Sequence, residues 1–293
     1  MDQDMRAAAI ALYDRYTHEG MDRRAFMAQL TRIAGSAAAA SALLAGIAAD
    51  PAAAAVISEA DKRIAGRRMS WPVAAGRIYR GYQAEPKRAE QPLGTVLVIH
   101  ENRGLNAHME DVARRIAIAG YRAVAPDFLS PAGGTPTDQD AAREAIGKLD
   151  LGRSAADAVA TLRLLASLPN ANGKVGAVGF CWGGGMVNRI AVAAGGALHA
   201  GVPFYGPAPD PSLAGQVEAA MLLHYAGEDE RVNRTGLPWA EALQAAGKRV
   251  ESHVYPGVQH AFHNDTSAER YDASAAELAW RRTLDFFARE LAG

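Results

Sequence analysis

After about residue 65, short apolar runs alternate along the chain with segments of helical periodicity. The runs are nearly continuous and rich in β-branched residues, as in strands that are buried on both faces of a sheet. They lie at residues 95–100, 121–125, 175–178, 200–205, 220–225 and 249–255. The segments between and after them predict helices at 106–120, 138–149, 154–168, 186–194, 237–246 and 273–291. Two shorter runs, at 66–72 and 77–84, predict a leading antiparallel hairpin. This alternation predicts an α/β fold with a mostly parallel, doubly wound sheet and helices on both faces.

The sequence Gly179-Phe180-Cys181-Trp182-Gly183 joins the run at 175–178 to the following helix. We expect a sharp turn there with Cys181 in a strained backbone conformation, because glycines stand where side chains would collide with neighbouring backbone. With serine at its centre this geometry is the nucleophile elbow, in which the next backbone N–H, here that of Trp182, forms half of an oxyanion hole. A thiol at a helix N-terminus also favours the thiolate. A small buried cysteine beside a glycine-rich turn is the alternative interpretation.

An acid and a histidine follow two later strands. Asp229 comes just after the run at 220–225, and His260 just after the run at 249–255. Both positions are at the edge where open α/β sheets bind their ligands. The chain order Cys, Asp, His is the order of a hydrolase triad, so we predict that these three residues act together. Glu228 and Glu230 are alternatives to Asp229, and a solvated surface residue is the alternative for His260.

From about residue 65 to the end, the chain resembles the dienelactone hydrolase family of α/β-hydrolases. The segments that carry the resemblance are 98–106 (VIHENRGLN), the Gly-x-Cys-x-Gly-Gly elbow, 227–229 (GED) and Gly257-x-x-His260-x-Phe262. The resemblance implies the α/β-hydrolase fold and hydrolysis of small esters or lactones through a thioester acyl-enzyme, with no cofactor.

By the same resemblance, Cys181 is the nucleophile, Asp229 the acid and His260 the base. Glu101, just past an earlier central strand, would bond the resting thiol and take part in its activation. The second oxyanion donor would be the N–H group of Asn102. A solvated loop acid is the alternative interpretation of Glu101.

One departure from the family concerns substrate charge. The best-known dienelactone hydrolases hold a substrate carboxylate with two arginines, and the corresponding places here, near 130–131 and 263–264, carry no fixed cation. Arg103 is the remaining candidate for substrate binding. We therefore expect neutral esters or lactones to be preferred over a carboxylated one.

Residues 1–55 differ in composition from the rest. Arg23-Arg24, a phenylalanine at 26, an alanine-rich run at 34–49 and small residues at 50–55 resemble a twin-arginine export signal, with Asp22 where Ser or Thr is usual. The alternatives are an amphipathic helix or a membrane anchor, and the run is shorter than the ~20 apolar residues that a spanning helix needs. We therefore predict an export signal and extension over 1–55 and a single α/β-hydrolase domain over 56–293.

This division implies that the twin-arginine machinery is a partner of the precursor. The mature protein would then be periplasmic and bind no membrane; without a working signal it would be cytoplasmic.

Composition limits the remaining possibilities. The 31 basic and 32 acidic residues leave no surplus charge for nucleic acid. The single cysteine permits no internal disulfide. His260-x-x-His263 is the nearest approach to a metal motif and lacks a third ligand nearby, so no metal is predicted. A different class of function is a periplasmic thiol protein, redox-responsive or binding-only, on a hydrolase scaffold.

Overall fold

The computed structural model describes residues 3–48 and 55–293. Most of the small-residue segment at 50–55, where the signal is expected to end, therefore lies outside the described residues.

The described strands form one sheet with the order β1-β2-β4-β3-β5-β6-β7-β8. β1 and β2 are antiparallel to each other, β2 is antiparallel to β4, and all other neighbours are parallel. The predicted leading hairpin and mostly parallel sheet are therefore confirmed. The strands are β1 (Ile64–Ala74), β2 (Arg77–Pro86), β3 (Leu93–Ile99), β4 (Arg122–Asp127), β5 (Ala171–Phe180), β6 (Ala200–Phe204), β7 (Ala220–Ala226) and β8 (Val250–Tyr255).

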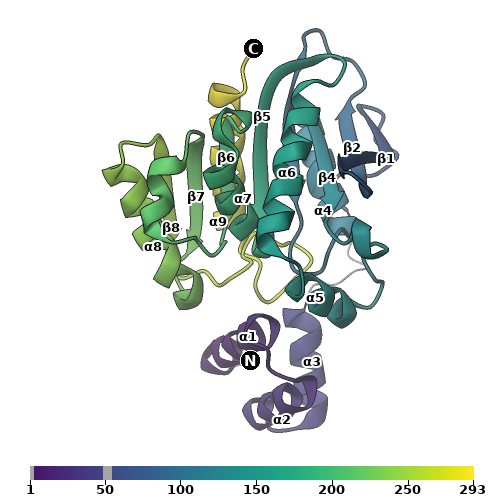
Figure 1. The fold of residues 1–293 in the computed structure, drawn as a ribbon. Helices are drawn as coiled ribbons and strands as arrows, with labels where there is room; N and C mark the ends of the chain where they lie inside the picture. Colours follow the sequence, from purple (N-terminus) through teal and green to yellow (C-terminus); the bar gives the residue numbers. More distant parts are fainter. Residues whose placement is uncertain (1–2, 49–54) are drawn as a thin grey trace.

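Helices cover both faces of this sheet (Figure 1). On one face lie α4 (Ala107–Ile118) and α9 (Ala273–Glu290), and on the other lie α6 (Leu151–Ala166), α7 (Trp182–Ala193) and α8 (Glu230–Ala245). Along β3, Val96 and Val98 pack in the first layer while Leu97 and Ile99 pack in the second. Because successive side chains of a strand point to opposite faces, a fully apolar strand supplies both layers. Shorter elements are α5 (Gln139–Gly147) and 3-10 turns at Ser130–Ala132, Gly195–Ala197 and Pro211–Gln216.

Among the helices that begin earlier than the sequence pattern predicts, α8 differs most. α8 starts at Glu230 rather than near 237, because the Asp229 side chain caps it by accepting a hydrogen bond from Val232 N at 3.1 Å. Its first turns are polar, which hides the helical period, and Pro238 lies inside the helix. The cap places Asp229 at a fixed point directly after β7.

The N-terminal segment folds into three helices that lie together at one end of the sheet (Figure 1). We call them the N-terminal cap: α1 (Gln3–His18), α2 (Arg23–Ala34) and α3 (Ala37–Ile47). They bury a core of their own, made of Ala9, Ile10, Leu12, Tyr13, Tyr16, Phe26, Leu30, Ala40, Leu43 and Ile47. Asp22 caps α2 by accepting from Arg24 N and Ala25 N, so the residue that departs from the usual signal pattern has a structural use here. No single described helix is long and apolar enough to cross a membrane; α2 and α3 meet that test only as a pair, and they are bent by 107°.

Candidate active site

Cys181 lies at the tip of a strained turn between β5 and α7. Its backbone has φ 55° and ψ −114°, a conformation that costs on the order of 1–3 kcal/mol for a residue with a side chain. A Cβ atom at Gly179 would lie 2.2 Å from the carbonyl oxygen of Gly183, and one at Gly183 would lie 2.3 Å from that of Ile99. The glycines at both positions are therefore required by close backbone contacts, as the sequence predicts. The turn presents the thiol at the N-terminus of α7.

The predicted acid and base also meet there. His260, in the loop after β8, has its Nδ1 atom 2.5 Å from Asp229 Oδ2. Both side chains are almost fully buried, as is that of Cys181. Asp229, rather than Glu228 or Glu230, is the acid bonded to the imidazole. A ring nitrogen of His260 lies within 4.8 Å of Cys181 Sγ.

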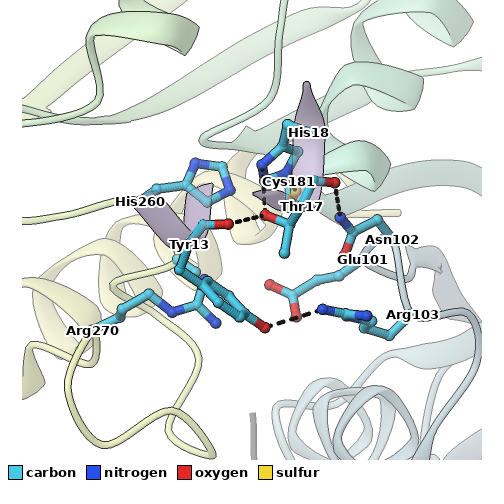
Figure 2. Close-up of a pocket in the computed structure, with 10 residues that line it drawn as sticks. Tyr13, Thr17, His18, Glu101, Asn102, Arg103, Cys181, His260 and Arg270 are labelled. Atoms are coloured by element: carbon cyan, nitrogen blue, oxygen red, sulfur yellow. Dashed lines mark hydrogen bonds between the residues drawn. The ribbon is translucent and has the colours of Figure 1, made fainter. Parts of the chain in front are cut away.

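Three further predicted residues line a small pocket beside Cys181 and His260. Glu101, Asn102 and Arg103 follow β3 and face it from one side (Figure 2). Glu101 Oε2 accepts a hydrogen bond from Asn264 Nδ2 at 2.7 Å. The hydrogen bond that we expected between Glu101 and the resting thiol is not among the contacts of the described residues. Cys181 Sγ instead contacts a histidine that the sequence analysis had assigned to the export signal.

That histidine is His18, the last residue of α1. Its Nε2 atom lies 3.1 Å from Cys181 Sγ, and its Nδ1 atom lies 3.0 Å from Asp14 Oδ1 one turn earlier in the helix. Asp14 in turn accepts from Arg231 Nε at 2.9 Å. The only sequence signal for this contact is the spacing of Asp14 and His18, which puts both on one face of a helix.

The cap also contacts the two guanidinium groups that line the pocket. Arg103 donates to the Tyr13 hydroxyl at 3.0 Å, and Arg270 lies 5.1 Å from the centre of the Tyr13 ring and donates to the Ile47 carbonyl at 3.0 Å. The cavity left beside Cys181 has a volume of only about 20 Å³. It has room for about one water molecule. An ester or lactone therefore cannot reach Cys181 while α1 is in place.

Charges of alternating sign set the protonation of this cluster. Burial alone would raise the pKa of the Cys181 thiol, but the positive charges of His18 and His260 lower it from 9.0 to about 6. Burial would likewise lower the pKa of His260, but the carboxylates of Asp229 and Asp14 and the thiolate raise it to about 10. Between these two values the site holds a thiolate and an imidazolium.

The structure changes the basis of the expectation about substrate charge. Ser130 hydrogen-bonds the backbone of Arg80 and Asp127, and Asn264 holds Glu101, so neither place supplies a cation, as the sequence indicates. However, Arg270 lines the pocket opposite Arg103. The pocket thus has a second cation that the sequence pattern does not indicate, and the preference for a neutral ester or lactone stays a prediction.

His263 is not part of the cluster. Its ring packs against Phe180, Phe204 and Trp280, and burial lowers its pKa to about 3. His263 is therefore a neutral residue of the core, and its spacing from His260 does not indicate a pair of metal ligands.

Comparisons with known proteins agree with this geometry. The model of the dienelactone hydrolase family matches residues 79–291. The chain belongs to this family. The carboxymethylenebutenolidase of Pseudomonas putida is 32% identical over 222 residues, which is 73% of this chain and 92% of that one. An Escherichia coli K12 protein, provisionally named a carboxymethylenebutenolidase, is 31% identical over 255 residues, 82% of this chain and 93% of that one. The predicted family is thus confirmed.

Solved structures confirm the α/β-hydrolase fold. A Klebsiella pneumoniae protein, provisionally named a dienelactone hydrolase, superposes with a TM-score of 0.70 at 29% identity and covers 77% of this chain and 99% of its own. The dienelactone hydrolase of Anabaena variabilis superposes with a TM-score of 0.63 at 22% identity, covering 78% and 100%. These proteins match almost entirely while about a fifth of this chain stays outside the match, and the family model excludes the cap altogether. The family match thus covers most of the sheet, from β2 to β8, and the helices that pack on both of its faces.

Replacing His18 should move the titration of the thiol. In His18→Gln one positive charge next to the sulfur is lost, so the pKa of Cys181 should rise from about 6 toward that of an ordinary thiol, and the thiolate should be lost at higher pH than in the wild type as pH falls. The ultraviolet absorbance of the thiolate, followed against pH in the intact chain, measures this midpoint, and Cys181→Ala gives the baseline. A midpoint that stays at the wild-type pH would show that His18 does not influence the thiol.

Removing the cap should open the site. A chain that begins at Val56 keeps the hydrogen bonds from Val56 and Ile57 to Asp111 and all of the sheet. Because an occluded site reacts only in its open fraction, kcat/KM for a small ester should rise roughly tenfold or more over the full chain. The same truncation carrying Cys181→Ala corrects for background hydrolysis. Equal kcat/KM in the two lengths would mean that α1 does not block substrate.

Proposed function

We propose that this protein is a cysteine-dependent hydrolase of small esters or lactones that works through a thioester acyl-enzyme. The observation that carries the proposal is the position of Cys181 on the strained elbow, with the bonded His260–Asp229 pair beside it. A thiolate, an imidazolium and an orienting carboxylate are the three groups that acyl transfer to sulfur requires. Membership of the dienelactone hydrolase family supports the same class of reaction.

The first half of the reaction forms the thioester. The Cys181 thiolate attacks the carbonyl carbon, and the backbone N–H groups of Trp182 and Asn102 stabilise the oxyanion. When the tetrahedral intermediate collapses, the His260 imidazolium gives its proton to the leaving alkoxide. Asp229 holds the ring through Nδ1, so that Nε2 faces the reacting atoms throughout.

The second half releases the acid. His260, now neutral, takes a proton from a water molecule that attacks the thioester carbonyl, and the sulfur leaves as the thiolate. Glu101 faces the same pocket, and we assign it a part in activating the thiol once the cap has left and His18 no longer contacts the sulfur. The reaction needs no cofactor.

We also propose that residues 1–55 are a twin-arginine export signal and that the mature enzyme is periplasmic. The paired Arg23 and Arg24 stand at the start of α2, and Arg23 keeps a side chain that is 65% exposed although it pairs with Asp140. The arginine pair therefore stays accessible on the folded chain, as export of a folded protein requires. Cleavage near residue 55 would remove α1 and with it the contact between His18 and Cys181.

Two substitutions of the nucleophile test the activity on the chain that begins at Val56. Cys181→Ala should abolish hydrolysis, and Cys181→Ser should keep at most a trace, because a serine hydroxyl needs a stronger base than a thiol to lose its proton. The assay is a screen over short acyl esters, thioesters and lactones, with and without a carboxylate, and trapping of the thioester by mass spectrometry. Full turnover in Cys181→Ala would end the proposal, whereas stoichiometric peroxide consumption without ester turnover in the wild type would favour a thiol redox protein.

Export is tested by changing the paired arginines. Arg23→Lys with Arg24→Lys keeps the charge but removes the paired guanidinium groups, so the full-length precursor should accumulate in the cytoplasm. Arg32→Lys, elsewhere in α2, is the matched control and should export normally. Fractionation of cells with an antibody to the sheet domain measures the outcome, and a cleaved periplasmic form in the double variant would contradict the proposal.

A further inference from the structure

Three side chains with metal-binding atoms converge where α1 meets the elbow. His18, Cys181 and His260 each direct one ligand atom into a shared space, and these atoms all lie within 4.8 Å of one another (Figure 2). The closest pair is Cys181 Sγ and His18 Nε2, at 3.1 Å. Tetrahedral zinc, bound at about 2.3 Å from sulfur and 2.0–2.1 Å from nitrogen, requires ligand atoms roughly 3.3–3.6 Å apart. The closest pair would separate by about half an ångström or less, and the other pairs would close by at most about 1.5 Å to admit the ion.

Both imidazoles are already oriented as metal ligands are. The Nδ1 atom of His18 lies 3.0 Å from the Asp14 carboxylate, and that of His260 lies 2.5 Å from the Asp229 carboxylate. A carboxylate on the far nitrogen fixes the tautomer of a zinc-binding histidine and increases the basicity of the nitrogen that binds the metal. Two independent carboxylate–histidine pairs therefore aim their Nε2 atoms at one sulfur.

A buried atom without a partner points to a ligand in the same place. His260 Nε2 is buried in a side chain that is only 4% exposed and has no hydrogen-bond partner within the described residues; the Asp14 carboxylate lies 4.0 Å away, beyond hydrogen-bond distance. Buried polar atoms are nearly always paired, so such an atom facing a thiol and a second imidazole marks an incomplete site. The adjoining cavity of about 20 Å³ has room for one water molecule, which would complete four ligands.

We propose that α1 completes a zinc site made of His18 Nε2, Cys181 Sγ and His260 Nε2, which holds the cap on the active site. One thiolate and two imidazoles form a donor set that suits Zn²⁺ and is poor for Mg²⁺ or Ca²⁺, which prefer oxygen ligands. Binding forms one bond from Zn²⁺ to sulfur and two to nitrogen, and it releases to solvent the protons that these three atoms carry together with water from the hydrated ion. The site exists only while α1 is attached, because two of its ligands belong to the sheet domain and one to the cap.

The consequence for activity rests on the proposed function. A sulfur bound to zinc cannot attack a carbonyl, and an imidazole bound through Nε2 cannot move a proton. Zinc would therefore keep the full-length chain inactive, and loss of the cap would remove the third ligand. The metal site itself can be tested without any hydrolase assay.

The experiment uses the full chain, verified intact by mass and freed of metal with a chelator. Titration with Zn²⁺ against a chromophoric chelator measures affinity and stoichiometry. Titration with Co²⁺ reports thiolate ligation through its charge-transfer band and four-coordination through the intensity of its visible bands. We expect one equivalent of zinc, both cobalt signatures, and no comparable binding of Mg²⁺.

Variants outside the catalytic triad identify the third ligand. His18→Ala should weaken zinc binding by about 100-fold or more, because even the outer partners of a metal site contribute 10- to 100-fold. Asp14→Asn, which keeps His18 but weakens its orienting partner, should lose about tenfold and retain the cobalt–thiolate band. His253→Gln, a change of a partly buried histidine in β8, is the matched control and should bind as the wild type does.

The outcomes separate the two proposals. No stoichiometric zinc in the wild type, or equal affinity and an unchanged cobalt spectrum in a folded His18→Ala, would overturn the zinc site. Asp14→Asn gives a second reading should His18→Ala fail to fold, and equal affinity there would also count against the site. Suppose that zinc binds as expected but the metal-free chain that begins at Val56 turns over no ester. This result would support the zinc site and contradict the proposed function.

Discussion

The positive φ of Cys181 is the constraint on which the site depends. The turn is held by the sheet on one side, where Cys181 N donates to the Phe204 carbonyl at 3.0 Å, and by the packing of α7 against β3 on the other. Because β5 lies between β3 and β6 in the middle of the sheet, the thiol stands among the C-terminal ends of parallel strands. Side chains that follow β3, β7 and β8 can reach it without any long loop, and the proposed catalytic residues come from those ends.

Burial of charge is the second condition, and the cap changes how it is met. An unpaired buried ion costs several kcal/mol, so a thiolate in this position needs a cation next to it. In the capped chain the charges alternate from Asp14 through His18 and Cys181 to His260 and Asp229. Departure of α1 removes one anion and one cation together. It leaves a net charge of −1 on Cys181, His260 and Asp229, which the neighbouring positive charge of Arg231 offsets. The cap can therefore dissociate without leaving a buried charge unpaired at the catalytic centre.

The sequence predicts the common part of the fold and the three residues of the triad because the signals for both lie within short segments of the chain. Strand runs, helical periods, the glycine-flanked cysteine and polar residues directly after strands each need only a few neighbours to be recognised. The beginning of α8 was missed because its first turns are polar and Pro238 lies within it. The roles of His18 and Arg270 were missed for another reason. His18 contacts Cys181, more than 160 residues away, and Arg270 contacts the end of α3, more than 220 residues away. The periodicity of a segment does not indicate which distant segment it will contact.

Under the proposals above, the first 55 residues have two tasks, export of the precursor and covering of the active site. A signal requires exposed arginines and a mild apolar run, and α2 and α3 supply them with modest alanine-rich helices. A cap requires a few polar side chains at fixed places, and α1 supplies those on a helix that stands before the arginine pair. Because the two sets of residues do not overlap, an export function of α2 and α3 would leave Tyr13, Asp14 and His18 free to fit the active site. In the proposed pathway the folded precursor would cross the membrane with its nucleophile covered. Cleavage of the signal would then remove α1 and give substrate access to Cys181.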